Sequence, residues 1–572
     1  MHNVIYLLLR RMRLPLIALI VTYAVSVLGL VLIPGMDDQG HPWHMDFFHA
    51  FYFVSFMGST IGFGEIPYPF TDAQRMWTLV TIYATVVAWL YAIGSLLSTL
   101  QDPAYRRVVR QSSFARGVRR IADPFYIVCG YGDTGTQVVA SLAERGKRCV
   151  VIDIDQARVD ALELEDLGMH VPGLCADAGD SDALLEAGLA RANCIGVIAL
   201  TNVDQVNLTI AITCRLLAPG IRTIARSEHH ESEANMESFG TDHVVNPFDT
   251  FADRFAMAIH SPAMYRIYEW MTSIHPGERT APDAAPQPHE RIAPPRGTWV
   301  ICGFGRFGKA LQRYLNFEGL RTVIIEADPQ TTEAPPETVA GRGTEAVTLR
   351  AAKVEEAVGI VAGTDDDANN LSIVITAREL QPKLFTVGRQ NQRRNDAMFT
   401  AAELDLIMQP GEIMARRILG LITNPLLADF LRHARHRDDA WAEALVAKIG
   451  NLTASTVPAI WSLRIDALEA AGLHLELRRG TAVDVATLCR DPRRREQSLP
   501  AIALLLRRAD GEQVLLPEDD VRLQPDDQLL FCGVSGSAGQ MRWTAQNHNV
   551  LEYVRTGSER PSGWIWRWLA RS

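Results

Sequence analysis

Cysteines are few in this sequence and never stand close together. Eight occur among 572 residues, and no two form a CxxC pair. Isolated cysteines inside apolar runs behave as small core residues, and thiols stay reduced in most intracellular compartments. The pattern therefore excludes a disulfide-stapled secreted scaffold.

Positive charge is scarce as well. Lysine and arginine total 56 against 66 aspartate and glutamate residues, giving a formal net charge of −10. A protein that binds phosphate backbones usually carries a basic face, so we expect no nucleic-acid partner. The length points to several domains, because 572 residues exceed what one domain normally holds.

Uncharged apolar runs of spanning length occur at residues 14–33 and 76–100. Each can cross a hydrocarbon core of ~30 Å as a helix. The first run is too long for a signal peptide and lacks a small-residue cleavage site. Arginines precede the first run and follow the second, whereas residues 34–75 carry five acidic residues and one arginine. We therefore predict a multi-pass protein of the cell (inner) membrane, embedded in the lipid bilayer with both termini cytoplasmic.

A short glycine-punctuated stretch lies between the two runs. Its glycines stand two apart and allow left-handed backbone angles, so successive carbonyls can point the same way. Four such strands around an axis would form rings of oxygen that replace the water shell of a potassium ion. An ordinary glycine-rich turn is the alternative, and the flanking spans favour the filter. The predicted filter residues are Thr60, Ile61, Gly62, Phe63 and Gly64.

Residues 45–58 complete this arrangement as a half-helix, because their apolar part is too short to span. Its negative C-terminal end would favour a cation at the filter. Helix, half-helix, filter and helix form the plan of the two-helix potassium channels, which this chain resembles. The usual motif there is Thr-Val-Gly-Tyr-Gly-Asp, whereas this chain has Ile61, Phe63 and Glu65 at the variable places. The resemblance implies K+ in a filter at 59–65 and a pore domain at residues 1–105.

One glycine lies near the inner end of the second span. Gly94 and Leu97 are the candidate bend and apolar constriction of an inner gate. Simple helix packing explains the same two residues, and both interpretations stay open. A basic, polar linker at 106–125 follows and connects the pore to the rest of the chain.

A buried strand predicted at 126–129 leads into a Gly-x-Gly-x-x-Gly turn and then a helix-like stretch. The glycines of such a turn allow a pyrophosphate to approach the backbone and rest on the helix N-terminus. An acid at the end of the next strand is placed to accept hydrogen bonds from a ribose. The predicted nucleotide-binding residues of this copy are Gly130, Gly132, Asp133, Thr134, Gly135 and Asp153.

The same arrangement recurs 173 positions later, and the register then shifts to 163. In that second register Thr201, Asn207 and Arg226 match Thr364, Asn370 and Arg389. Chance hardly produces such a series, so we infer an internal duplication of an α/β unit. The equivalent residues of the second copy are Gly303, Gly305, Arg306, Phe307, Gly308 and Glu326.

The fold class that follows is multi-domain, with a helical two-span pore, two Rossmann-like α/β domains and a small α+β C-terminal subdomain. In the subdomain we expect strands at 473–477 and 501–506. The tryptophan-rich tail leaves two interpretations open, contact with the membrane interface or packing onto the cytoplasmic core. The predicted segments are 126–275 for the first unit with its crossover helices, 276–297 for a Pro-rich linker, 298–450 for the second unit, 451–545 for the subdomain and 546–572 for the tail.

A two-helix pore followed by two such units resembles the tandem-RCK (regulator of potassium conductance) channels. The resemblance implies a homotetramer whose cytoplasmic units form a gating ring. It also implies a nucleotide ligand, NAD or NADH or else ADP or ATP, and we expect it in the first copy more than in the second. The acid Asp177 belongs to the first site, whereas Arg342 takes its place in the second copy. Two arginines there, Arg306 included, favour extra phosphate charge or a purely structural fold.

Calcium is the other ligand that the resemblance raises. One known carboxylate pair of the family would need an acid at Arg226 as well as at Glu228, and the arginine argues against that site. The acidic stretches 228–231 and 365–367 are either divalent-ion ligands or solvated helix caps, and the cap interpretation is favoured. No metal ligand is assigned.

The leading hypothesis is a ligand-gated potassium-selective channel that is not an enzyme. A membrane-anchored NAD-dependent oxidoreductase is the second hypothesis, but no Ser-Tyr-Lys or His-acid set accompanies the glycine turns. A regulatory subunit of a potassium transporter is the third, and such subunits normally lack pore helices of their own.

Overall fold

The computed structural model describes residues 2–272, 293–453 and 458–558. These residues form two compact units that divide after Arg120. Most of the predicted Pro-rich linker and the tryptophans of the tail lie outside the described residues.

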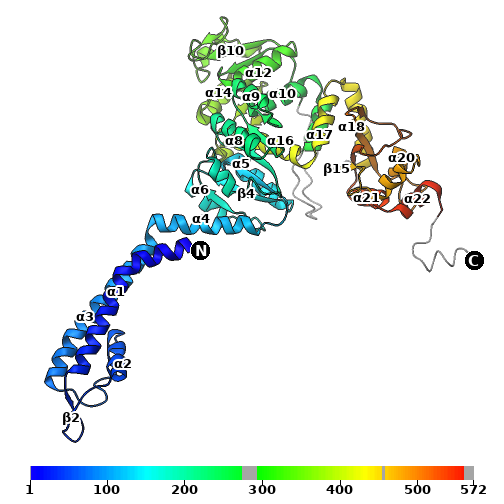
Figure 1. The fold of residues 1–572 in the computed structure, drawn as a ribbon. Helices are drawn as coiled ribbons and strands as arrows, with labels where there is room; N and C mark the ends of the chain where they lie inside the picture. Colours follow the sequence, from blue (N-terminus) through cyan, green and yellow to red (C-terminus); the bar gives the residue numbers. More distant parts are fainter. Residues whose placement is uncertain (1, 273–292, 454–457, 559–572) are drawn as a thin grey trace, which may run out of the picture. The chain divides into compact units, whose positions relative to one another are not determined.

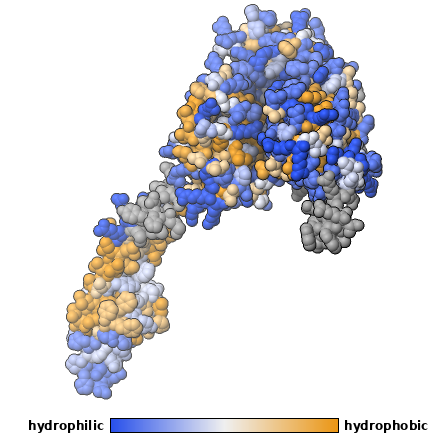
Figure 2. All heavy atoms as spheres, turned by 45° about the vertical axis from the view of Figure 1, so that its right-hand side comes forward, coloured by the Kyte–Doolittle hydropathy of each residue, from blue (hydrophilic) through white to orange (hydrophobic). Residues whose placement is uncertain are grey.

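The first unit is built from two long apolar helices and one short helix. Both long helices are long and apolar enough to cross a membrane, judged by length and composition. Figure 2 shows orange, hydrophobic residues gathered over the long part of this unit, with paler residues among them. The elements are α1 (His2–Leu32), β1 (Gly35–Met36), β2 (Pro42–Trp43), α2 (Phe47–Gly58), α3 (Asp72–Gln101) and α4 (Pro103–Arg120).

Close packing joins the three helices of this unit. A Cβ on Gly29 would lie 2.0 Å from Cε2 of Trp77, so only glycine lets α1 approach α3 here. The Trp77 indole donates to Ser26 O at 3.1 Å. Helix α3 starts four residues before the apolar run because Thr71 and Gln74 form a capping box. Most of the predicted linker 106–125 is helical, as part of α4.

Two six-stranded parallel sheets dominate the second unit, and their strands follow the same order. That order is β5-β4-β3-β6-β7-β8 in the first sheet and β11-β10-β9-β12-β13-β14 in the second, which is the Rossmann arrangement. The first sheet uses β3 (Phe125–Cys129), β4 (Arg148–Asp153), β5 (Gly173–Cys175), β6 (Cys194–Ala199), β7 (Arg222–Arg226) and β8 (His243–Val245); the second uses β9 (Trp299–Cys302), β10 (Thr322–Glu326), β11 (Val339–Ala340), β12 (Gly359–Ala362), β13 (Phe385–Arg389) and β14 (Leu406–Met408).

Helices connect the strands of each sheet. In the first copy they are α5 (Asp133–Glu144), α6 (Gln156–Leu164), α7 (Ser181–Glu186), α8 (Asp204–Leu217) and α9 (His230–Ser238). In the second copy they are α12 (Arg306–Phe317), α13 (Ala346–Ala351), α14 (Asp367–Leu380) and α15 (Asp396–Ala401), with 3-10 turns at Val354–Glu356 and Arg393–Asn395.

Hydrogen bonds repeat between the copies residue by residue. Asn207 Oδ1 accepts from Thr201 N at 3.0 Å, and its Nδ2 donates to Thr201 O and Arg226 O, both at 2.9 Å. Asn370 makes the equivalent bonds to Thr364 N and O, both at 2.9 Å, and to Arg389 O at 2.7 Å. The pairs matched in the sequence at a spacing of 163 therefore have the same structural role.

Each copy contributes one helix to the hydrophobic core of the other. Helix α10 (Pro247–His260) packs against α12, and α16 (Pro410–Thr423) packs against α5 (Figure 1). Five side chains of α10 lie in the core of the second copy, and six of α16 lie in the core of the first. The helices that continue from them are α11 (Pro262–Thr272), α17 (Pro425–Ala434) and α18 (Asp439–Thr453).

A small subdomain closes the described chain, with an antiparallel sheet in the order β15-β18-β16-β17. Residues 473–477 were expected to form a strand, and this expectation is wrong, because they lie in helix α19. Leu473 and Glu476 are buried while Leu475 is exposed, which is helical spacing. Helix α22, in the segment expected to be tail, packs against this subdomain. The elements are β15 (Ala459–Arg464), α19 (Ala471–Arg478), α20 (Val485–Leu488), β16 (Ala501–Arg507), β17 (Gln513–Leu515), β18 (Gln528–Gly533), α21 (Ser537–Gln546) and α22 (His548–Thr556).

Candidate functional site

The loop after α2 has an alternating backbone. Thr60, Gly62 and Gly64 have φ angles of 62, 66 and 101°, whereas the residues between them are not left-handed. Alternation of this kind turns successive peptide planes so that their carbonyls share one side of the strand. All five predicted filter residues lie in this loop.

The loop is attached to the end of α2 by its backbone and one ring. Thr60 N donates to Met57 O at 3.0 Å, and Ile61 N donates to Phe56 O at 2.9 Å. The Phe63 ring meets the Phe56 ring edge-on, with 5.4 Å between centroids. The loop therefore follows directly from the C-terminal end of the short helix, where the helix dipole favours a cation.

The two predicted gate residues lie in the last third of α3, which is continuous through both. Leu97 is exposed in the single chain, and no described atom lies within 4 Å of the place of a Cβ on Gly94. The structure of one chain thus leaves this stretch of α3 uncovered.

The first glycine turn joins β3 to α5. A Cβ on Gly135 would lie 2.0 Å from Gly130 O, and Gly130 has a φ of +103°, so both positions require glycine. A Cβ on Gly132 would meet only the guanidinium of Arg158, at 3.6 Å. The turn thus keeps an open surface at Gly132, at the N-terminus of α5.

Asp153, the acid that ends β4, points its carboxylate toward the first glycine turn. Asp153 is 4% exposed and accepts hydrogen bonds from Tyr131 N at 2.5 Å and from Asp155 N at 2.8 Å. Arg158, which the sequence did not single out, lies 3.6 Å from the Asp153 carboxylate. In the second copy Glu326 accepts from Phe304 N at 2.5 Å in the same way.

Asp177 lies apart from this group. Its carboxylate accepts from Gly179 N at 2.8 Å, and it does not line the cavity described below. Asp153 pairs with Cys175 and Glu326 pairs with Ala340, so Asp177 and Arg342 both stand two residues beyond the paired strand residue. The correspondence predicted between these two residues agrees with this register.

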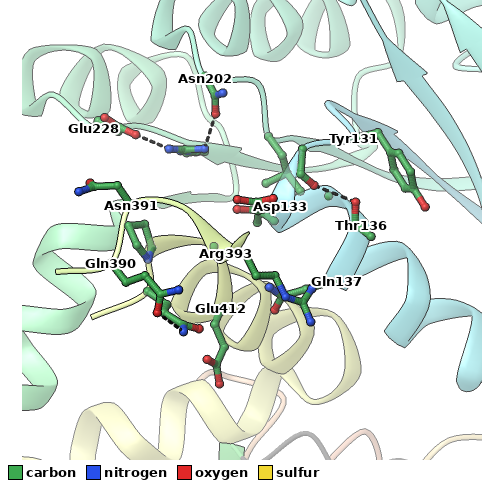
Figure 3. A pocket seen from close by; sticks show the side chains of 18 of the residues that line it. Tyr131, Asp133, Thr136, Gln137, Asn202, Glu228, Gln390, Asn391, Arg393 and Glu412 are labelled. Carbon is green, nitrogen blue, oxygen red and sulfur yellow. Dashed lines mark hydrogen bonds and ion pairs between the residues drawn. The ribbon is translucent and has the colours of Figure 1, made fainter. Parts of the chain in front are cut away.

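A cavity of about 630 Å³ opens between the two copies at the first glycine turn. Residues 131–137 form one wall, and the N-terminal end of α16 and the loop after β13 form another. From the second glycine turn only Arg306 reaches the cavity, while Phe307 is fully buried against Phe251. Figure 3 shows Tyr131, Asp133, Thr136 and Gln137 on the first-copy side, with Gln390, Asn391, Arg393 and Glu412 on the second-copy side.

Arginines from both copies converge in this cavity. Glu228 is ion-paired with Arg226 of its own copy and, at 2.5 Å, with Arg306 of the other. Arg389 is 9% exposed, and burial lowers its pKa despite the nearby Asp365. The guanidinium groups of Arg306 and Arg389 both lie over the Phe248 ring, at 5.5 and 4.9 Å. Such a concentration of guanidinium groups suits an anionic ligand.

The sequence assigned no role in this cavity to Arg389 or Phe248. Both come from outside the first glycine turn, and Phe248 belongs to an exchanged helix. A motif read from neighbouring residues cannot predict that these two side chains lie beside the first glycine turn. The repeated Arg226 and Arg389 were a usable signal, because in both copies this arginine ends the strand that follows the Asn-containing helix.

The acidic stretch 365–367 is engaged as loop and cap residues. Asp366 caps α14 by accepting from Asn369 N at 2.8 Å, and Asp365 pairs with Arg389 at 2.6 Å. Asp367 accepts from Asn391 N at 2.6 Å. Each acid thus has a separate protein partner.

At the other acidic stretch, 228–231, His230 lies close to Glu233 and Asp249. The atoms of these three side chains that could bind a metal ion lie within 4.8 Å of one another. Arg313 of the second copy lies on this group, donating to Asp249 at 2.5 Å. Burial and the nearby Asp249 raise the pKa of Glu233. A guanidinium thus already balances the charge of the cluster.

Residues 16–102 match the ion-channel family model, and residues 126–247 and 299–410 match the model of the TrkA-N domain. These segments are an ion-channel module and two TrkA-N domains. The ion-channel module contains α2, the filter loop and the apolar parts of α1 and α3. The glycine turns and the acids that end β4 and β10 lie inside the TrkA-N domains.

Known proteins are similar to this chain. The chain is 29% identical over 208 residues to potassium channel protein 1 of Methanocaldococcus jannaschii, covering 36% of this chain and 59% of that protein. It is 22% identical over 199 residues to the voltage-gated potassium channel Kch of Escherichia coli K12, covering 35% and 46%. A solved structure of the GsuK channel bound to NAD is similar with a TM-score of 0.47 at 16% identity, covering 94% of this chain and 98% of that one. The chain spans about half the length of the curated relatives it matches.

Proposed function

We propose that this chain is one subunit of a potassium channel whose TrkA-N domains regulate conduction by binding a nucleotide. The observation that carries the proposal is the alternating backbone of the filter loop, with left-handed φ at Thr60, Gly62 and Gly64. One chain supplies a quarter of such a filter, so the conducting form is a homotetramer around the filter axis. The similarity to curated potassium channels supports potassium as the ion.

The orientation follows from charge. Arginines flank the inner ends of both spans, so both termini and the TrkA-N domains lie in the cytoplasm and the filter loop faces outward. The protein then belongs to the inner membrane. Gly94 and Leu97, uncovered in the single chain, line the inner gate in the assembled channel.

The ligand is a nucleotide such as NAD, NADH, ADP or ATP, bound at the first glycine turn. Its phosphates rest on the N-terminus of α5 beside Gly132, and Asp153 accepts from a ribose hydroxyl. Arg306 enters the same cavity from the second domain. The second glycine turn contributes this arginine and holds no nucleotide of its own.

Binding regulates the channel if the ligand favours one arrangement of the two domains. A coupling of ~1–3 kcal/mol per site is typical. Four sites that each contribute about 1.4 kcal/mol or more together reach the ~5.5 kcal/mol that a full shift between closed and open requires.

Potassium flux tests the channel itself. The purified full chain in liposomes should release K+ along its gradient faster than Na+, and the flux should change when nucleotide reaches the cytoplasmic side. Turnover of NADH without ion flux would instead favour the oxidoreductase. Absence of flux together with restored uptake on adding a potassium transporter would favour the regulatory subunit.

A matched pair of glycine variants tests the nucleotide site. Gly132 and Gly305 both precede their helices with ordinary φ angles of −83 and −73°, and an added methyl group meets nothing closer than 3.6 Å at either. Both Gly132→Ala and Gly305→Ala should therefore fold. We expect Gly132→Ala to weaken binding of ADP or NAD by roughly tenfold, because the methyl group keeps phosphate off the turn, which corresponds to about 1.4 kcal/mol.

Isothermal titration of the two variants with NAD, NADH, ADP, ATP and calcium measures this difference. Gly305→Ala should bind like the unmodified protein. Equal losses in both variants would mean that the second turn also binds, and an effect in Gly305→Ala alone would move the site to the second domain.

A further inference from the structure

Two arginines at matching places in the two TrkA-N domains reach the same cavity. Arg226 ends strand β7 and Arg389 ends strand β13, at the spacing of 163 that relates the copies. Their Nη1 atoms have matching partners too, because Arg226 donates to Asn202 at 2.8 Å and Arg389 donates to Asp365 at 2.6 Å. Both side chains line the cavity between the domains. The duplication thus places one guanidinium group from each domain in the cavity wall.

The two guanidinium groups have donors that the described chain leaves unused. Arg389 is 9% exposed, and among the described residues only its Nη1 has a hydrogen-bond partner. Arg226 donates to Asn202 and Glu228, both labelled in Figure 3, but its buried Nε donates to no described acceptor. An unpaired buried donor costs about 1–3 kcal/mol, and more when it is charged. An acceptor that enters the cavity from solution removes part of this cost.

The charges around the two arginines do not balance. Arg226 shares the carboxylate of Glu228 with Arg306 of the second glycine turn, and Arg389 has Asp365 as its counterion. Three guanidinium groups therefore face two carboxylates. The Asp365 side chain is also 81% exposed, so water screens its attraction to Arg389. An excess of positive charge remains at this end of the cavity.

The other acids that line the cavity have different surroundings. Glu165 accepts from the Tyr131 hydroxyl at 2.8 Å, and Glu412 pairs with Arg416 at 2.5 Å. Asp133 lies in the first turn of α5, where the helix dipole favours a negative charge. None of these three carboxylates is ion-paired with Arg226 or Arg389.

The guanidinium group of Arg389 is held in a fixed place. Its Cζ lies 4.9 Å from the centroid of the Phe248 ring, which belongs to the exchanged helix α10. Stacking of this kind orients the planar fork of an arginine. Such a fork matches two oxygens of a phosphate group, which accept from it in parallel. The arrangement is therefore prepared for an oxyanion.

We propose that Arg226 and Arg389 form a subsite for a phosphate group at the junction of the two TrkA-N domains, apart from the first glycine turn. The inference deepens the proposed nucleotide regulation and rests on it. The phosphate group belongs either to the far end of a nucleotide bound at the first turn or to inorganic phosphate bound beside it. In both cases one anion accepts hydrogen bonds from both domains, so its binding favours the arrangement in which the two arginines lie together.

The experiment titrates the purified full-length protein by calorimetry with AMP, ADP, ATP and inorganic phosphate, each alone in a phosphate-free buffer. If the group belongs to the nucleotide, ADP or ATP should bind more tightly than AMP. Arg226→Gln and Arg389→Gln should each reduce that advantage by about tenfold, the effect of one hydrogen bond to a charged group. If the source is free phosphate, inorganic phosphate should bind by itself, and the same two variants should weaken its binding by about tenfold.

Arg393 provides the matched control. It also lines the cavity but is exposed, and Arg393→Gln removes the same charge as Arg389→Gln. Arg393→Gln should leave the advantage of ADP or ATP over AMP, and the affinity for inorganic phosphate, nearly unchanged. Equal losses in all three variants would show a diffuse attraction of anions and overturn the subsite.

Ion pairing that only holds the two domains together is the competing explanation. It predicts lower melting temperatures in Arg226→Gln and Arg389→Gln with unchanged ligand affinities, and this result overturns the proposal. If Arg389→Gln does not fold, Arg389→Lys takes its place, and its single point charge should give an intermediate loss of affinity.

The unmodified protein gives a decision of its own. Equal affinities for AMP, ADP and ATP, together with no binding of inorganic phosphate, overturn the subsite without any variant. Failure of every nucleotide to bind would refute the proposed ligand instead, and the titration with inorganic phosphate then decides the subsite alone. The two failures are therefore distinguishable.

Discussion

Among single residues, we expect His243 to make the stability of the first TrkA-N domain depend on pH. Burial, and then the charge of Arg222, lower its pKa from the usual value of 6.5, while Asp242 acts in the opposite direction and Arg417 and Arg432 add to the lowering. The folded state therefore favours the neutral imidazole. As pH falls through 6.5, the unfolded chain takes up the proton first, so the contribution of this group to stability is complete above 6.5 and is lost below it.

We therefore expect the melting temperature of the protein to fall between pH 7.5 and pH 5.5, and to fall less in His243→Gln. Thermal unfolding gives the slope of melting temperature against pH for each protein. The difference between the two slopes removes the contribution of the other titrating groups, which both proteins share. Parallel slopes would contradict the assignment.

The sequence alone predicts the place in the candidate site for some residues and not for others. Gly130, Gly135 and Asp153 act within one strand-turn-helix unit, so their spacing was enough to predict the turn that the structure forms. Phe248 reaches the cavity on an exchanged helix, and Arg389 reaches it from the end of β13 in the second copy. No local pattern near the first glycine turn encodes their meeting. Asp177 was assigned to the first site from the resemblance, but its carboxylate accepts from Gly179 N and does not line the cavity, because the position of a residue leaves the direction of its side chain open.

At the scale of elements, the exchanged helices make each domain depend on the other half of the chain. Phe255 of α10 is 1% exposed, and its ring meets Trp299 of β9 edge-on at 5.0 Å. Phe255→Ala should therefore destabilise the second domain, by about 3–5 kcal/mol, although the residue belongs to the first half. Hydrogen exchange at the amides of β9 measures the effect.

Ile418 of α16 provides the mirror experiment. It is fully buried in the core of the first domain, in the same cluster of apolar side chains as Tyr126 and Val128 of strand β3. Ile418→Ala should speed exchange in β3 and leave β9 less affected, the reverse of Phe255→Ala. If each variant loosened only its own half, the exchange of helices would not operate in solution.

The sequence predicts whether a segment is a strand or a helix correctly where all its side chains are buried, and it fails where buried and exposed side chains are mixed. The strands that precede the glycine turns are buried along their whole length, and such runs read as strands of a parallel sheet. The stretch 473–477 alternates leucine with polar residues, which favours a strand, yet Glu476 is buried through contacts with Arg479 and Thr481. A buried, paired carboxylate hides the helical period from any reading based on hydrophobicity alone.

For the whole molecule, duplication within one chain allows the two halves to become different. Asn207 and Asn370 keep the same bonds, whereas Asp133 and Arg306 occupy the same place in the two glycine turns with opposite charge. A homodimer of one such unit would present two equal cavities. The tandem chain can devote one turn to a ligand and use the other to supply an arginine to it.

If the exchanged helices hold the two TrkA-N domains together, the covalent link between them is dispensable once the protein has folded. A protease site inserted between residues 276 and 297 should allow complete cleavage while both fragments elute as one species in size-exclusion chromatography. The physical reason is the burial of α10 and α16 side chains in the opposite cores, where each large apolar side chain contributes about 1.5–3 kcal/mol. The same cleavage in a chain carrying Phe255→Ala and Ile418→Ala should release the fragments. Separation of the unmodified halves would show that the linker, and not the exchange, keeps the cavity between the domains closed.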